Sequence, residues 1–311
     1  MTNVLVTGGA GFIGSHLCDR LLAEELRVVA LDDLSSGHIG NLAEARAYGQ
    51  QFTFYNLGVQ TDGLGQIFER HQPEVIMHLA ALRTPESRLD APAEASAGIM
   101  GLLAVLECAA RADVRKVVFA SSAEVYGDAR RFPLKESSVA GSRPLTPAAI
   151  SKKVAEDYLR AYVRYRGIAF TSLILPTVYG PRQDPGPAGG VVARFAAALV
   201  AGEKPLVHGD GSQTRDFLFI DDAVHAFALA GERGDGQTLN IGTGLDTSVN
   251  DVLRMLSDIT GYKGEPLFEA PPLAEIRRCV LDNESAQREL GWKPWTHLED
   301  GLRETVAFLK G

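Results

Sequence analysis

V-L-V-T-G-G-A-G-F-I-G, residues Val4 to Gly14, is the stretch that decides the fold. Its first three apolar residues favour a strand, and a helical pattern from Ser15 to Ala23 follows the last glycine. Gly8 permits a tight turn, Gly11 lets a diphosphate come close to the backbone, and Gly14 lets helix and strand pack together. The N–H groups at the start of such a helix bind phosphate. The stretch therefore predicts a strand, a glycine turn and a helix that hold a dinucleotide.

A second apolar strand, Arg27 to Leu31, ends in Asp32 and Asp33. An acidic residue about twenty positions after the glycine turn is placed to accept hydrogen bonds from the adenosine ribose. Because Asp32 would repel a ribose 2′-phosphate, the pattern favours NAD over NADP. The alternative is an ordinary strand, turn and helix without a ligand.

Strands and helices alternate along the first half of the chain. This alternation predicts an α/β fold, a Rossmann-type doubly wound parallel sheet whose ligands lie at the carboxyl ends of the strands. The predicted strands cover 52–57, 75–79 and 114–121, and the predicted helices 64–71, 93–112 and 147–166. After Pro176 the pattern becomes mixed. We expect an NAD-binding domain over 1–176, to which 216–244 returns, and a smaller mixed α/β substrate lobe over 177–215 and 245–311.

The composition excludes several classes of protein. A formal net charge of −8 argues against non-specific binding to nucleic acid or to acidic membranes. Three scattered cysteines and seven histidines show no metal-ligand spacing and no disulfide framework, so we expect no metal. No apolar run reaches transmembrane length and Met1 leads directly into a strand, which predicts a cytoplasmic protein without a membrane partner.

Further motifs follow one another in a familiar order. They are L-D-D-L-S-S-G, H-L-A-A, S-S-A-E-V-Y-G-D, V-Y-G-P-R, G-D-G-S-Q-T-R-D-F, D-D-A-V-H-A, N-I-G-T-G and R-E-L-G-W-K-P. Together with the glycine turn, this set resembles the extended short-chain dehydrogenases that remodel nucleotide-sugars, the NAD-dependent epimerase/dehydratase family. The resemblance implies a UDP-sugar substrate that NAD oxidises at C4. A second event then gives a 4-epimerase, a dehydratase or a decarboxylase.

The segment from Ser121 to Gly127 bears on which reaction follows. By resemblance, Ser122 hydrogen-bonds the C4 hydroxyl. Glu124 stands where 4-epimerases usually have Thr, Ser or Ala, and it resembles the glutamate with which sugar dehydratases remove the C5 proton. A C4 ketone acidifies that proton, and a carboxylate is a competent base. UDP-glucuronate decarboxylases also carry a carboxylate there, and a solvated loop glutamate is the remaining alternative.

Two family positions in the catalytic region carry alanine. Ala123 stands where 4,6-dehydratases have an acidic Asp, so Glu124 would have to serve as both base and acid. Ala148 stands where the family's Tyr-x-x-x-Lys motif has its tyrosine, whereas Lys152 remains to bond the nicotinamide ribose. Either the tyrosine was removed by engineering, or the chain only binds its ligands, or another group takes the C4 hydroxyl proton. The candidates for that group are Tyr126, Tyr179, Ser122 and Lys152.

The resemblance also assigns the binding residues. Arg215 and Arg278 grip the diphosphate, His208 stacks on uracil, and Arg83 reaches the cofactor or the diphosphate. Thr177 and Gly98 stand where relatives have Asn. The expected cofactor contacts are Gly8, Gly11, Phe12, Ile13, Asp32, Asp33, Ser36, Asn56, Leu57, Leu79, Ala80, Ala81, Lys152 and Pro176, and the expected substrate contacts are Arg83, Ser122, Glu124, Thr177, Val192, Leu206, His208, Arg215 and Arg278.

These observations predict an NAD-dependent nucleotide-sugar dehydratase. It would oxidise C4, remove the C5 proton with Glu124, expel the C6 hydroxyl as water and return the hydride. The missing acidic residue at Ala123 makes the chain resemble UDP-N-acetylglucosamine 5,6-dehydratases of tunicamycin biosynthesis, an antibiotic pathway. The alternatives are a UDP-hexose 4-epimerase and, because of Ala148, a catalytically impaired binder of NAD or nucleotide-sugar. The apolar helices over 93–112 and 147–166 predict a homodimer.

Overall fold

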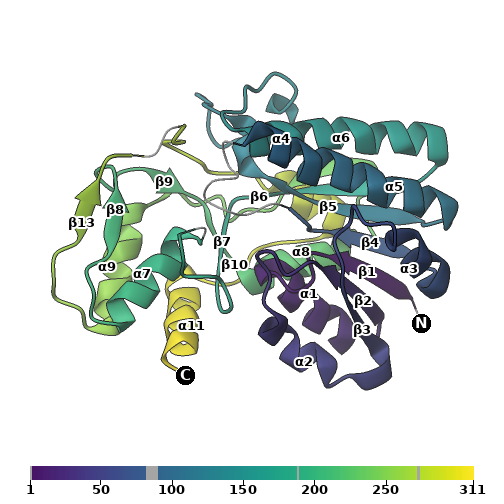
Figure 1. Cartoon of the computed structure of the whole chain (residues 1–311). Coiled ribbons are helices and arrows are strands. Elements are labelled where there is room, and N and C mark those ends of the chain that lie inside the picture. The colour runs from purple at the N-terminus through teal and green to yellow at the C-terminus, as the bar shows by residue number, and fades with distance from the viewer. Residues whose placement is uncertain (1, 82–89, 188, 272–273) are drawn as a thin grey trace.

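A seven-stranded parallel sheet forms the centre of the molecule (Figure 1). The structure is a computed structural model that describes residues 2–81, 90–187, 189–271 and 274–311. The strand order β11-β6-β5-β4-β1-β2-β3 reverses direction between β1 and β4, which confirms the predicted doubly wound sheet. The strands are β1 (Asn3–Thr7), β2 (Arg27–Asp32), β3 (Phe52–Asn56), β4 (Val75–His78), β5 (Lys116–Ser122), β6 (Ala169–Leu175) and β11 (Gln237–Asn240).

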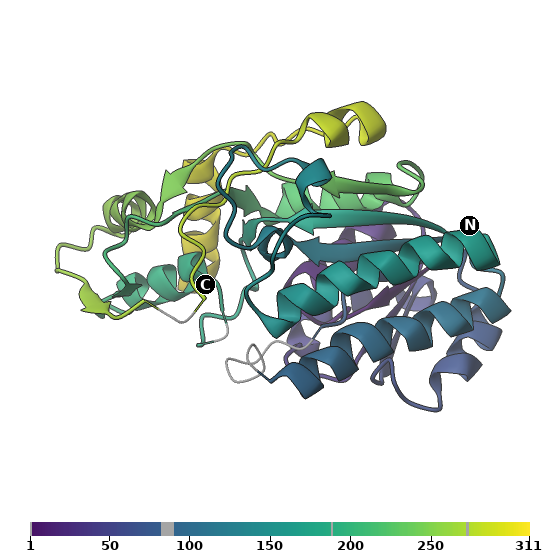
Figure 2. The same cartoon turned by 90° about the horizontal axis from the view of Figure 1, so that it is seen from above.

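Helices cover both faces of this sheet. Val4 and Val6 of β1 join a core with α1 (Phe12–Ala23) and α8 (Ile220–Ala230), whereas Leu5 joins a separate core on the opposite face. Successive side chains of a strand point to opposite faces, so a strand buried on both must be apolar throughout. The second core holds α3 (Leu64–His71), α5 (Gly101–Arg111) and α6 (Pro147–Arg166), and Figure 2 shows α5 and α6 side by side.

The helix before β5 is continuous from Ala91 to Arg111 but changes its winding. It consists of α4 (Ala91–Glu94), a π-helical segment η4 (Ala95–Met100) and α5. Among the described residues, it is the one helix long and apolar enough to cross a membrane by length and composition. In this structure Leu102, Val105 and Leu106 are buried against the sheet, and Met100 is 57% exposed.

A smaller lobe lies beside the sheet, on the left in Figure 1. Its α7, α9 and α11 share a core, and β8 and β13 pair in parallel, while β9 and β12 pair antiparallel. The short strands β12 and β13 are not among the strands predicted from the sequence. The lobe's elements are α7 (Val191–Val200), β8 (Leu206–His208), β9 (Thr214–Arg215), β12 (Thr247–Ser248), α9 (Val249–Thr260), β13 (Leu267–Glu269) and α11 (Leu298–Lys310).

The chain crosses between the sheet and the smaller lobe more than once. β7 (Thr177–Tyr179) leaves the sheet, and β10 (Phe217–Phe219) pairs with it in parallel before α8 and β11 return. Near the end of the chain, the indole N–H of Trp292 donates to the Asp222 carbonyl on α8, which fixes the C-terminal segment to the sheet side. The remaining helices are α2 (Ala43–Arg46) and α10 (Glu284–Leu290), with short 3-10 turns over 39–42, 49–51, 123–126 and 136–138.

Candidate active site

The glycine turn lies where the strand order reverses, at the carboxyl ends of β1 and β4. Gly8 adopts φ +71°, and a Cβ at Gly14 would lie 2.0 Å from the Gly8 carbonyl oxygen. A Cβ at Gly8 would lie 2.9 Å from the backbone nitrogen of Ala80, so the turn abuts the segment after β4. Gly11 is the N-cap residue of α1, and no N-cap side chain accepts a hydrogen bond from the N–H groups at the start of this helix. The turn is therefore a backbone cradle of the kind that accepts a diphosphate.

Asp32 connects the end of β2 to this turn. One carboxylate oxygen accepts the N–H of Ala10 and the other accepts the N–H of Leu34, each over 2.9 Å. Burial raises the pKa of Asp32, although these hydrogen bonds oppose the shift. Each carboxylate oxygen has a second lone pair for a further donor such as a ribose hydroxyl. Asp32 therefore shapes the cradle and fits the ribose-binding role that the sequence predicts.

The other expected ribose and adenine contacts gather around Asp32. Asn56 pairs in register with Asp32, and the Leu57 N–H donates to the Asp32 carbonyl over 3.0 Å. Asp33 is exposed and accepts both the N–H and the hydroxyl of Ser35, which stabilises the turn where the exposed Ser36 lies. The structure thus brings these predicted residues to one edge of the sheet.

The catalytic candidates gather at the end of β5. The Ser122 hydroxyl accepts the N–H of Glu124 over 3.2 Å at the start of the 3-10 turn η5 (Ala123–Tyr126). The Thr146 hydroxyl donates to Glu124 Oε2 over 3.3 Å and also accepts the N–H of Ala149, which caps the N-terminus of α6. The carboxylate of Glu124 is therefore held between the strand end and the start of α6.

Lys152, one turn further along α6, is fixed to the same strand. Its Nζ donates to the Ala120 carbonyl over 2.6 Å and lies 4.6 Å from the centre of the Phe119 ring. The His78 ring stacks on Phe119, and its Nδ1 lies 2.8 Å from the Thr7 hydroxyl. Burial, aided by the charge of Lys152, lowers the pKa of His78 to about 3. His78 is therefore a neutral packing group beneath a cationic side chain.

The two arginines expected at the diphosphate are neighbours in the smaller lobe. Thr214, next to Arg215, forms a β-bridge with Arg278, and its carbonyl accepts the N–H of Cys279 over 3.2 Å. Arg278 also contacts the carboxylate of Asp246 over 2.6 Å. Guanidinium groups suit a diphosphate because their N–H groups match phosphate oxygens.

The residues expected around the base occupy different environments. His208 ends β8 and accepts a hydrogen bond from Arg194 at its Nε2 over 3.3 Å, and Leu206 is half-buried at the start of the same strand. Val192 is wholly buried in the lobe's core, so packing accounts for it better than base contact does. Arg83 lies outside the described residues.

Residues 4–242 match the family model described as the NAD dependent epimerase/dehydratase family. The chain belongs to this family. Members with similarity over nearly the whole chain include the UDP-glucose 4-epimerase of Mycolicibacterium smegmatis, which is 42% identical over 309 residues and covers 98% of both chains. A putative UDP-glucose 4-epimerase of Methanocaldococcus jannaschii is 34% identical over 99% of this chain and 98% of its own.

Solved structures of family members share the fold closely. A UDP-glucose 4-epimerase from Thermotoga maritima, crystallised with UDP-glucose, has a TM-score of 0.94 and 38% identity over 99% of both chains. A UDP-glucose 4-epimerase from Thermus thermophilus in complex with NAD has a TM-score of 0.90 and 33% identity, covering 100% of this chain and 99% of its own. The cofactor of this epimerase/dehydratase family member is NAD, and the glycine cradle with Asp32 fits it.

The two tyrosines considered as replacements for the family tyrosine have other partners. Tyr126 is 3% exposed and donates its hydroxyl to Asn240 Oδ1 over 2.7 Å, and burial raises its pKa. Tyr179 is 1% exposed and donates to the Leu298 carbonyl over 3.1 Å, and burial raises its pKa too. A phenol with a raised pKa is a poor source of phenolate. The structure therefore favours a structural role for Tyr126 over the catalytic role that the sequence suggests.

The sequence-based assignment omitted two residues of this epimerase/dehydratase site. Thr146 precedes Pro147 at the start of α6, and a threonine before a first-turn proline is an N-cap signal that could have identified it. His78 ends an apolar strand, and nothing in the local pattern distinguishes it from an exposed histidine. Gly98 lies in the π-helical segment, where a Cβ would come within 3.1 Å of Ser151 Cβ on α6.

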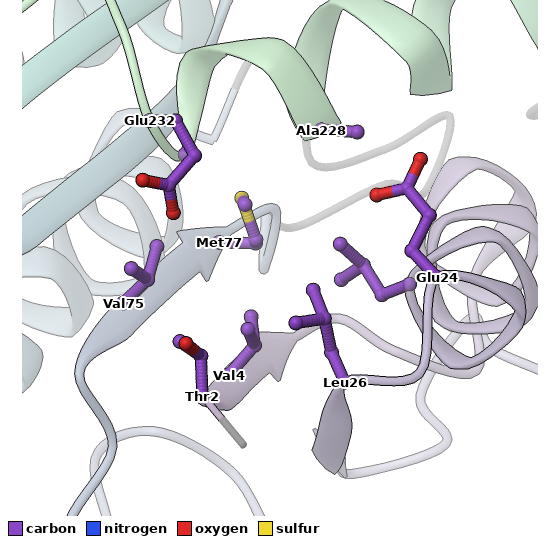
Figure 3. A pocket seen from close by; sticks show the side chains of 10 residues that line it. Thr2, Val4, Glu24, Leu26, Val75, Met77, Ala228 and Glu232 are labelled. Atoms are coloured by element: carbon purple, nitrogen blue, oxygen red, sulfur yellow. The ribbon is translucent and has the colours of Figure 1, made fainter.

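A separate hollow of about 150 Å³ lies at the amino ends of β1 and β4, on the edge opposite the glycine cradle. Figure 3 shows Glu24 and Glu232 on opposite sides of the apolar Val4 and Met77. Both carboxylates already pair with arginines, Glu24 with Arg20 over 2.6 Å and Glu232 with Arg115 over 3.2 Å. None of the residues that line this hollow belongs to the candidate active site.

Proposed function

We propose that the protein is an NAD-dependent UDP-hexose 4-epimerase. The proposal rests on the similarity to UDP-glucose 4-epimerases over 98% of the chain, together with the placement of Ser122 and Lys152 at the end of β5. These observations support the UDP-hexose 4-epimerase, which the sequence analysis gives as an alternative, over the dehydratase that the sequence predicts. UDP is the favoured nucleotide because the similar crystallised epimerase from Thermotoga maritima was solved with UDP-glucose.

Each residue would contribute binding or proton handling. When bound, NAD supplies a hydride acceptor for the sugar's C4. Ser122 would hydrogen-bond the C4 hydroxyl, and the ammonium group of Lys152 would hold the nicotinamide ribose. Arg215 and Arg278 would bind the diphosphate, which leaves the sugar able to turn its other face while the nucleotide stays fixed.

Dehydration is the second candidate, and Glu124 is the observation that favours it. A carboxylate in this position could remove the C5 proton of a 4-keto sugar, after which the C6 hydroxyl leaves as water. UDP-N-acetylglucosamine would then be the first substrate to try, with a 5,6-alkene as product. The similar proteins named above carry epimerase names, so the 4-epimerase remains the first proposal.

One incubation separates these reactions. The purified chain is incubated with NAD in heavy water and either UDP-glucose or UDP-N-acetylglucosamine, and the product is followed by NMR and mass spectrometry. A C4 epimer without loss of water supports the first proposal. Loss of one water's mass supports dehydration and contradicts the first proposal. Binding without conversion supports the impaired binder, and an Ala148→Tyr variant that regains conversion would show that the missing tyrosine is the cause.

We also propose that the protein forms a homodimer through α5, α6 and the π-helical segment. Apolar side chains are exposed along these helices, among them Met100, Ile150, Tyr158, Val163 and Tyr165. Exposed apolar residues on two adjacent long helices are typical of an interface that continues into a four-helix bundle. The cytoplasmic location expected from the sequence stays a prediction.

A further inference from the structure

Ala148 leaves the active site without the phenol that would take the proton of the sugar's C4 hydroxyl. Its side chain is a methyl group, half-buried on the first turn of α6. We propose that the carboxylate of Glu124 accepts this proton instead. The proposal rests on the proposed UDP-hexose 4-epimerase function, and it changes the role of Glu124 from a base for C5 to the base for the C4 hydroxyl.

Glu124 is held at the position that this role requires. Its N–H donates to the hydroxyl of Ser122, the residue expected to contact the C4 hydroxyl, so the two side chains belong to one turn. Its Oε2 accepts the hydroxyl of Thr146, which is two residues before Ala148 on the chain. The carboxylate thus lies beside the N-terminus of the 20-residue helix α6, where the helix dipole stabilises negative charge.

The turn that carries Glu124 also packs against the segment that carries Arg278. Ala123 and Val125, the chain neighbours of Glu124, belong to one buried apolar cluster with Cys279. Burial raises the pKa of the Cys279 thiol to about 12, with the negative charges of Asp216 and Glu124 contributing to the rise and Arg215 opposing it. Cys279 follows Arg278 and hydrogen-bonds to Thr214. The turn that carries Glu124 therefore lies between the end of β5 and the segment that carries Arg278, where we expect the sugar of a UDP-hexose to bind.

The other candidates are less suitable as proton acceptors. The hydroxyls of Tyr126 and Tyr179 donate to Asn240 and to the Leu298 carbonyl in buried surroundings. Lys152 donates to the Ala120 carbonyl and lies over the Phe119 ring, an environment that suits an ammonium ion. An ammonium ion already carries its proton, so it can orient the substrate but cannot accept a further one.

The proposed step balances with NAD as the hydride acceptor. The O–H bond at C4 breaks, its proton moves to a carboxylate oxygen of Glu124, and its electron pair forms the second bond of the C4 carbonyl. The C4 hydrogen would leave with its electron pair as a hydride, for which NAD would be the acceptor when bound. On the return, the carboxylic acid of Glu124 gives the same proton back to the C4 oxygen, whichever face of the sugar carbon is reduced.

A binding cycle tests this contact without relying on turnover. Calorimetry measures the dissociation constants of UDP-glucose and UDP-4-deoxyglucose for the NAD-loaded wild type and for Glu124→Ala. A hydrogen bond to a carboxylate is worth enough for the wild type to prefer the 4-hydroxyl sugar by about tenfold. We expect Glu124→Ala to lose most of this preference and to keep only the part that the Ser122 hydroxyl provides. The same preference in the variant and the wild type would overturn the proposal.

Single-turnover absorbance of the reduced cofactor then separates the two roles of Glu124. If Glu124 takes the C4 hydroxyl proton, Glu124→Gln should form reduced cofactor about 10²- to 10⁴-fold more slowly than the wild type. Glu124→Asp should recover part of the rate, and exposed Glu69→Gln is the matched control. Reduced cofactor that forms at the wild-type rate in Glu124→Gln, with only a later step blocked, would assign Glu124 to C5 and contradict the proposal.

These outcomes are distinct from a failure of the proposed function. Conversion of UDP-hexose by the wild type tests the epimerase assignment, whereas each variant is judged against that wild type. If the wild type converts neither UDP-hexose, the epimerase assignment fails, and the binding cycle still decides whether Glu124 contacts the C4 hydroxyl.

Discussion

The hydroxyl of Tyr126 donates to Asn240 Oδ1 over 2.7 Å and joins the turn after β5 to the edge strand β11. The amide nitrogen of Asn240 in turn donates to the carbonyls of Leu134 and Asp282, over 2.8 Å and 3.0 Å. Asn240 therefore links three segments that are far apart in the chain. Tyr126 contributes to the connection between the sheet and the smaller lobe, beside the active site.

Tyr126→Phe should lower stability without lowering the rate of the chemical step. Removing the hydroxyl leaves Asn240 Oδ1 without this buried donor, which should cost about 1 kcal/mol of the free energy of unfolding. Urea unfolding and kcat measured on the same preparation test this, with Tyr179→Phe as the matched variant. A fall in kcat of two orders of magnitude at unchanged stability would restore Tyr126 as a catalytic residue.

Gly14→Ala should damage the NAD site and the fold together. The new Cβ would lie 2.0 Å from the Gly8 carbonyl oxygen, so α1 or the glycine turn must shift. We expect a loss of about 1–3 kcal/mol in the free energy of unfolding and at least about tenfold weaker NAD binding. Gly65→Ala in α3 is the control, because no atom lies within 4 Å of its Cβ, and it should gain about 0.5–1 kcal/mol. Normal NAD affinity in Gly14→Ala would show that the turn is not held by this contact.

His78 should make the protein less stable in mild acid. Its pKa falls from 6.5 to about 3 on folding because of burial, so below pH 6.5 the unfolded chain binds one more proton than the folded chain. Stability from this residue is therefore complete above pH 6.5 and is lost progressively as the pH falls towards 3. Between pH 7 and pH 5 the wild type should lose about 2 kcal/mol more than His78→Gln, as measured by urea unfolding. Parallel pH profiles of the two proteins would refute the assignment.

The proposed dimer predicts a specific effect at Tyr165, which is 76% exposed near the end of α6. Sedimentation should show a dimer at micromolar concentration. Met100→Glu and Tyr165→Glu together should give monomers, because charges in an apolar interface are costly to bury. The control is Phe308→Glu, which changes an exposed aromatic residue on α11 in the smaller lobe. A wild type that sediments as a monomer would contradict the dimer.

Local sequence patterns were sufficient to predict most of the helices and strands of the nucleotide-binding half. The glycine turn and α6, with its threonine cap and glycine end, are specified by neighbouring residues, so 147–166 is predicted with its observed bounds. The short strands β12 and β13 could not be predicted because each is stabilised by a partner far along the chain. β13 pairs with β8, and the intervening residues give no sign of it.

In the candidate site, too, the sequence predicts what local patterns specify and misses contacts between residues far apart in the chain. The sequence places Ser122 and Lys152 at a strand end and on a helix, and the structure brings them to the same end of β5. The sequence could not show that Thr146 holds the carboxylate of Glu124, since 22 residues separate them. Nor could it show that the Tyr126 hydroxyl is already engaged, because its partner Asn240 is 114 residues away.

The position of β11 at the sheet edge has a consequence for how the protein is made. β11 pairs with β6, although α7, β8, β9, β10 and α8 are all synthesised between these two strands. A chain emerging from the ribosome cannot complete its sheet when the first 176 residues are out. It must wait for Gln237–Asn240, and the Trp292 bond to α8 forms later still. Nascent chains halted at residue 200 should therefore remain protease-sensitive, even though the glycine turn has long been translated.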